Sequence, residues 1–249
     1  MWPDIENPPG EVQLSTELTH TAPQVQLSDG NRVVTNAKGY RMTKATHGVT
    51  SGTWYYEVTL LNDQGAVRLG WSQISGDLQG PCGMDHYSYS FRNQPATRFH
   101  NSCGHSYGQS YHQGDVLGVL ISLPSLTEEQ YWDLRRRRFV LHRDQRYTAF
   151  DYTPKLPADG HMPVVPHGNI AYFLNGECLG TAYDKLYLGK YYPAISCYMG
   201  AQVRVNFGPD FHCPPPTTWQ GESVNAMSTC PAENYIQEES DRPLDEPPR

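Results

Sequence analysis

The chain has 249 residues and a formal net charge of −7, with 12% aromatic residues, 22 glycines and 20 prolines. This length allows one large domain or two small ones, and abundant aromatic and turn-forming residues favour short β-strands over helices. No apolar run reaches the roughly 18 residues that a membrane span requires, and no basic and apolar leader follows Met1. The composition therefore predicts a soluble all-β protein, neither secreted nor membrane-bound.

Charge is distributed unevenly along the chain. The first 21 residues carry −4 and the last 30 carry −5, so the residues between them carry +2. Acidic ends without periodicity are typical of disorder, and we expect residues 1–21 and 220–249 to be disordered. The mildly basic middle favours an acidic partner. The six cysteines include no Cys-x-x-Cys pair, which predicts free thiols in a reducing compartment.

Strand patterns begin after residue 22. An alternating pattern at 23–28 leads through a Ser-Asp-Gly-Asn turn to 32–35, which predicts a hairpin. Asn175-Gly176 is the strongest hairpin signal in the chain. The remaining strand patterns lie at residues 38–42, 46–49, 52–60, 67–73, 87–92, 114–121, 169–174, 178–183, 191–198 and 201–207. So many short strands with so little helical periodicity predict a two-sheet antiparallel sandwich.

The strand pattern is interrupted at about residues 124–166. This stretch contains the run Arg135–Arg138 and is rich in proline, aspartate and glycine. It is too short and polar to bury its own core, so we expect a long loop insertion within a single domain spanning 22–219. The arginine run is either a nucleic-acid or nuclear-import patch, or solvated loop charge.

Two arginines lie within strand patterns that otherwise bury apolar residues. Alternation along 67–71 places Val67, Leu69 and Trp71 on one face and Arg68 on the other. In the same way, Arg92 faces away from the aromatic residues of 87–92. A guanidinium held on a rigid strand can bind a carboxylate or phosphate. The alternative is a solvated charge, or a pair with a neighbouring carboxylate.

No recognised catalytic motif is present: the chain has no nucleophile elbow, phosphate-binding loop, dinucleotide fingerprint or His-Glu-x-x-His. Cys103 or Cys197 could act as a nucleophile only beside a base and an orienting acid, which the sequence does not identify. We therefore predict a protein that is not an enzyme and uses no metal or cofactor. Four side chains with irregular spacing could act as zinc ligands, or could simply be surface residues: His100, Cys103, His105 and His112.

A series of motifs, in order along about residues 22–218, resembles the SPRY domain family. The resemblance is closest to the trithorax-group SPRY subunits of Set/MLL-type histone H3 lysine-4 methyltransferase complexes, and it implies a bent β-sandwich. The motifs are Gly39-Tyr-Arg-Met, Ala45-Thr-His-Gly-Val, Gly52-Thr-Trp-Tyr-Tyr-Glu-Val, Arg68-Leu-Gly-Trp-Ser-Gln, Gly80-Pro, Tyr87-Ser-Tyr-Ser, Arg98-Phe-His, Gly114-Asp-Val-Leu-Gly, Phe173-Leu-Asn-Gly, Tyr192-Pro-Ala-Ile-Ser and Asn206-Phe-Gly-Pro.

The resemblance implies a nuclear, non-catalytic scaffold that binds an acidic, phosphorylatable segment of the WD-repeat subunit and so supports the SET-domain methyltransferase. An alternative is a SPRY adaptor of another kind, such as a substrate-recognition or RNA-associated module. The family has a tyrosine and a lysine where this chain has Met84 and Gln94, so a hydroxyl and a cation are lost. The family's partner-binding positions correspond to Tyr40, Arg68, Pro81, Met84, Arg92 and Gln94.

Two features of the family are not found in the sequence. No zinc-binding or winged-helix region precedes the SPRY motifs, so direct DNA binding is not expected. Residues 231–239 show no amphipathic helix of the kind that docks the small helical dimer subunit of these complexes. The sequence therefore predicts either a truncated chain or one that no longer binds that partner.

Overall fold

A computed structural model describes residues 4–127, 129–130 and 163–233. Its larger sheet contains, in spatial order, β1 (Gln26–Ser28), β2 (Val33–Thr35), β15 (Gln202–Asn206), β4 (Gly52–Leu60), β9 (Val116–Leu123), β11 (Asn169–Leu174) and β12 (Glu177–Tyr183). Two further strands, β16 (Thr218–Trp219) and β17 (Glu222–Ala226), extend it beside the start of β4. All pairings are antiparallel except that of β17 with β4.

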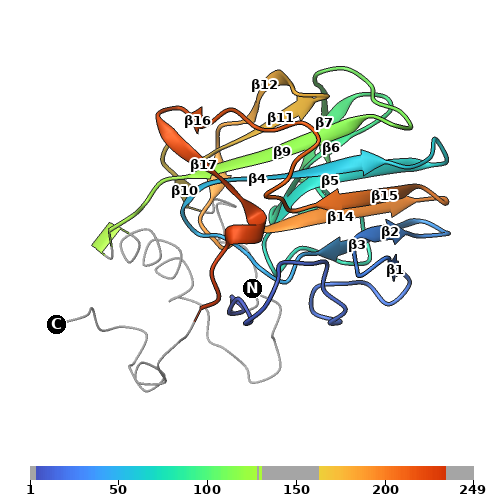
Figure 1. Cartoon of the computed structure of the whole chain (residues 1–249), viewed down its shortest axis with the longest axis horizontal. Coiled ribbons are helices and arrows are strands. Elements are labelled where there is room, and N and C mark those ends of the chain that lie inside the picture. Colours follow the sequence, from blue (N-terminus) through green and yellow to red (C-terminus); the bar gives the residue numbers. More distant parts are fainter. Residues whose placement is uncertain (1–3, 128, 131–162, 234–249) are drawn as a thin grey trace, which may run out of the picture.

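The second sheet carries the candidate site and is antiparallel throughout. Its strands, in spatial order, are β3 (Tyr40–Lys44), β14 (Tyr192–Tyr198), β5 (Ala66–Ser72), β6 (Ser88–Arg92), β7 (Thr97–His100) and β8 (Cys103–Ser106). Figure 1 shows that the strand axes of the two sheets are roughly aligned. The predicted all-β antiparallel sandwich is therefore confirmed.

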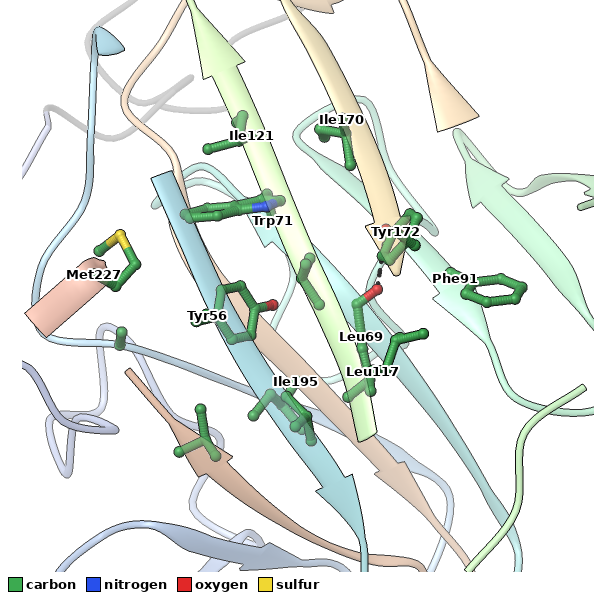
Figure 2. Close-up of a cluster of buried hydrophobic side chains, with 14 of the residues drawn as sticks. Tyr56, Leu69, Trp71, Phe91, Leu117, Ile121, Ile170, Tyr172, Ile195 and Met227 are labelled. Atoms are coloured by element: carbon green, nitrogen blue, oxygen red, sulfur yellow. Dashed lines mark hydrogen bonds between the residues drawn. The ribbon is translucent and has the colours of Figure 1, made fainter. Parts of the chain in front are cut away.

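The core lies between the two sheets (Figure 2). The inward residues Val67, Leu69 and Trp71 of β5 are fully buried, as alternation predicted. Buried tyrosines satisfy their hydroxyls across the core: Tyr56 donates to the Gly70 carbonyl, and Tyr172 donates to the Leu69 carbonyl at 3.1 Å. Buried phenols need such partners, because an unpaired hydroxyl inside a core costs about 1–3 kcal/mol.

Both predicted hairpins form. β1 and β2 pair around the Asp-Gly-Asn turn, and β11 and β12 pair around Asn175-Gly176 with Leu174 opposite Glu177. Asn175 and Gly176 have φ values of 51° and 87°, the left-handed conformation that a two-residue hairpin turn requires. The turn residues of the sequence thus identify these two strand pairs correctly.

The expected disorder of residues 1–21 is wrong for the described part, residues 4–21. Leu14 is fully buried in the core, and it forms an isolated bridge with Ala45. The backbone of Ser15 donates to the Lys44 carbonyl at 3.0 Å, and Thr46 donates to the Gln13 carbonyl at 2.8 Å. The segment covers the free edge of β3, which gives it backbone partners that its own sequence pattern does not reveal.

The expected disorder of 220–249 is wrong for residues 220–233, while 234–249 lie outside the described residues. β17 pairs with β4, and η1 (Met227–Thr229) places Met227 in the core. Lys190, almost fully buried, pairs with Glu233 and also donates to the Ile5 carbonyl at 2.7 Å. Lys190 thus contacts both the blue N-terminal and the red C-terminal segments of Figure 1.

Most of the predicted insertion, including Arg135–Arg138, lies outside the described residues. After it, β10 (Val164–Val165) pairs with β13 (Leu186–Tyr187) in a separate two-stranded sheet. None of the described helices has the length and apolar character needed to cross a bilayer.

Candidate protein-binding site

The two predicted arginines lie on neighbouring strands of the smaller sheet. The antiparallel register of β5 and β6 places Arg68 directly opposite Arg92. Both point to the outer face, because Leu69 and Phe91, the next pair in this register, are buried in the core. Like charges directly opposite in a sheet are unfavourable, so this arrangement requires compensation.

Phe99 of β7 provides part of that compensation. Its ring centroid lies 3.6 Å from the guanidinium carbon of Arg68 and 4.9 Å from that of Arg92. The negative face of an aromatic ring attracts cations, by about 0.5–2 kcal/mol per contact. Phe99 therefore holds the two guanidiniums side by side. Phe99 was not among the predicted site residues, although it lies in the Arg98-Phe-His motif that resembles the SPRY family.

Arg68 is only 9% exposed, yet its hydrogen bonds are incomplete. Nη1 donates to the Cys82 carbonyl at 3.4 Å, while the buried Nε has no hydrogen-bond partner among the described residues. No described carboxylate forms an ion pair with Arg68 or Arg92. Burial lowers the pKa of Arg68, opposed by the nearby Tyr40 phenol. The site therefore holds a desolvated cation without a counter-ion, which an incoming anion would stabilise.

Arg92 is the more accessible of the pair. It is half-buried, and its guanidinium donates to the Pro95 carbonyl and to the Thr97 hydroxyl, both at 3.2 Å. These two bonds use the Nε and Nη2 donors, and Nη1 completes the planar group. The orientation of Arg92 is thus fixed before any ligand arrives, which lowers the entropic cost of binding.

Tyr40 lies on the other side of Arg68. Its ring centroid is 5.2 Å from the Arg68 guanidinium carbon, and its ring stacks on Tyr198 with centroids 4.8 Å apart. Burial raises the pKa of Tyr40, with Arg68 and Arg92 acting in the opposite direction. The phenol therefore remains protonated at neutral pH and can donate a hydrogen bond to an anion.

The loop between β5 and β6 is tied to the outer face of the sheet. Cys82 donates its backbone N–H to the Ser196 hydroxyl at 2.9 Å, and its carbonyl accepts from the Ser90 hydroxyl at 2.6 Å. The Asp85 carboxylate accepts hydrogen bonds from the backbone of Tyr87 and the Ser88 hydroxyl. Because the same Cys82 carbonyl also contacts Arg68, this loop positions the guanidinium.

The other three predicted site residues, Pro81, Met84 and Gln94, differ in their surroundings. Pro81 immediately precedes Cys82 and is half-buried. The Met84 side chain lies against Gly80, where an added Cβ would come within 2.3 Å of the Met84 methyl carbon. Gln94 follows β6 and is half-buried, but no hydrogen bond joins it to either arginine in the described part of the chain.

The histidine and cysteine side chains considered as zinc ligands do not form a metal site among the described residues. Among the described residues, no group of three or more histidine, cysteine, aspartate or glutamate side chains could hold a metal ion. His100 instead stacks on Tyr89 with ring centroids 4.0 Å apart, and His112 lies 3.7 Å from Asp63. Cys197 is buried in the core, where burial raises the pKa of its thiol to about 12. Such a thiol is a poor nucleophile at neutral pH.

Comparisons with known proteins agree with this fold. Residues 53–127 and 165–210 match the SPRY domain. The chain is 37% identical over 200 residues to the Set1/Ash2 histone methyltransferase complex subunit ASH2 of Drosophila melanogaster, covering 79% of this chain and 36% of that protein. It is 36% identical over 200 residues to the corresponding subunit of Caenorhabditis elegans, covering 75% and 35%.

A third relative is the Set1 complex component ash2 of Schizosaccharomyces pombe, which is 30% identical over 249 residues, covering 85% of this chain and 38% of the yeast protein. The chain thus spans little more than a third of the length of these relatives. With its all-β sandwich and its SPRY match, the chain belongs to the SPRY-domain family and is a relative of the ASH2 subunits of Set1 histone methyltransferase complexes.

Proposed function

We propose that the chain is a non-catalytic subunit of a nuclear histone H3 lysine-4 methyltransferase complex. Its relatives are named as subunits or components of Set1 complexes, and a SET-domain methyltransferase would be the catalytic partner. In this role the SPRY domain binds an acidic segment of the WD-repeat subunit, and the pair together support the active arrangement of the enzyme.

The observation that carries this proposal is the desolvated Arg68 guanidinium with its unpaired Nε. An aspartate or glutamate side chain, or a phosphate, supplies the counter-ion that this guanidinium lacks among the described residues, and Arg92 and Tyr40 provide further donors beside it. Charge-assisted hydrogen bonds of this kind contribute about 1.5–3 kcal/mol each. Pro81 and Phe99 add rigid apolar surface around the charged centre.

The test uses the purified chain with the WD-repeat subunit of the complex. A second version of that subunit has every aspartate and glutamate of its acidic segment replaced by asparagine or glutamine. We expect co-elution in size-exclusion chromatography with the original subunit only, and weaker binding as salt increases. Equal co-elution of the neutralised subunit would contradict the proposal.

Catalytic support is measured separately. Adding the chain to the SET-domain enzyme and the WD-repeat subunit should raise the rate of methyl transfer to histone H3 lysine 4. The neutralised WD-repeat subunit should abolish this gain. A methyltransferase activity of the chain alone would show that the assigned non-catalytic role is wrong.

A further inference from the structure

An exposed apolar turn lies next to the two arginines. Tyr198 and Met199, at the end of β14, are 38% and 51% exposed, and in the described part of the chain they are among the few large apolar side chains at the surface. Tyr198 stacks on Tyr40, and Tyr40 in turn lies beside the Arg68 guanidinium. The apolar surface is therefore continuous with the cationic one.

The turn is held rigidly from two sides. Asn36 is 2% exposed, and its amide nitrogen donates to the Gly39 and Cys197 carbonyls at 2.7 Å and 3.2 Å. Its own carbonyl accepts from the Gly200 N–H at 2.9 Å. On the other side, the amide nitrogen of Asn62 donates to the Gly200 carbonyl at 3.1 Å. The backbone of the turn is thus fixed in the unbound protein.

Met199 occupies this turn with φ of 52°, in the left-handed region that asparagine and glycine adopt more readily. Its side chain is also half exposed, so folding gains little from an apolar residue at this position. An apolar side chain held in water in a disfavoured backbone conformation is typical of a binding surface.

Strand geometry sets the distance between the two surfaces. On β14, Ser196 lies opposite Arg68, and Tyr198 is two residues further along the same face. Two residues of an extended strand span about 6.6 Å. An extended ligand that runs along β14 and whose carboxylate reaches Arg68 therefore carries another side chain, about two residues away, to Tyr198 and Met199.

We propose that Tyr198 and Met199 form a second subsite of the same docking surface. It takes an aliphatic or aromatic side chain that lies two residues from the carboxylate bound by Arg68. This inference rests on the proposed function and narrows its ligand: an extended acidic segment interrupted by an apolar residue. The two arginine cations bind the acidic residues of the ligand, and the adjoining apolar turn binds its apolar residue.

Three short synthetic peptides with identical acidic residues test this inference by fluorescence anisotropy at low salt. Two carry a leucine two residues before or after the central glutamate, and the third carries serine at both positions. We expect one leucine peptide to bind the chain about fivefold more tightly than the serine peptide, because part of the leucine becomes buried.

The variant Met199→Asn should lose this gain while binding the serine peptide unchanged. Asparagine suits the left-handed conformation, so the turn is retained, and thermal unfolding checks this. Leu18→Asn, at another apolar position that is 71% exposed against 51% for Met199, should keep the gain. A gain that survives Met199→Asn, or no gain with either leucine peptide, overturns the inference alone. Absence of binding by all three peptides overturns it together with the proposed function.

Discussion

Replacing Arg68 by methionine is expected to weaken binding of the acidic segment about 10- to 100-fold. The substitution removes the guanidinium, and with it the equivalent of one charge-assisted hydrogen bond of about 1.5–3 kcal/mol. Arg68 lies at the centre of the site, between the Tyr40 and Phe99 rings. Isothermal titration calorimetry with a peptide of the acidic segment measures the loss.

The same variant should fold normally. Methionine keeps the apolar stem, and removing a buried charge that no described carboxylate pairs with leaves the free energy of unfolding unchanged or higher. The matched control is Arg204→Met, which makes the same charge change at an exposed arginine paired with Asp29 on the other sheet. Equal affinity losses in both variants would indicate a general charge effect, and would count against a specific role for Arg68.

Replacing Leu14 by alanine should destabilise the protein by about 2–5 kcal/mol, since truncation of a fully buried leucine loses burial and creates a cavity. Chemical denaturation followed by tryptophan fluorescence measures this change. The result would establish that the N-terminal segment is an integral part of the sandwich.

The matched control for Leu14 lies four residues further along the same segment. Leu18 is 71% exposed, so Leu18→Ala should change stability by less than about 0.5 kcal/mol. If the two variants were equally stable, the segment would not pack against the core in solution, and its expected disorder would be correct after all.

The sequence predicts the features that depend on local patterns. Alternation along 67–71 correctly separates Arg68 from its buried neighbours, and the Asn175-Gly176 turn identifies a hairpin. These predictions succeed because the period of a strand and the φ values of a turn are set by a few adjacent residues.

Features that depend on distant contacts could not be predicted in the same way. Val12 and Leu14 are isolated apolar residues without periodicity, and only the edge of β3 gives them an ordered place. The register that sets Arg68 opposite Arg92 follows a loop of fifteen residues, whose path depends on contacts of Cys82 and Asp85. The position of Phe99 requires the pairing of β6 with β7 as well.

The resemblance to SPRY subunits supplied the candidate residues, and the structure adds physical reasons for some of them. Arg68 is desolvated and Arg92 is held in place by Pro95 and Thr97, whereas Gln94 makes no hydrogen bond to either arginine among the described residues. Gln94 therefore remains a prediction that rests on the resemblance alone.

The most direct test of the central claim observes the arginine side chains themselves. In a nitrogen-15 NMR titration with the acidic peptide, the Nε–H signals of Arg68 and Arg92 should shift, with the larger change at Arg68, because its guanidinium is the more desolvated and has no counter-ion among the described residues. Assignment by the Arg68→Met variant identifies that signal. Shifts confined to other arginines, such as Arg98 or Arg204, with Arg68 and Arg92 unchanged, would contradict the account.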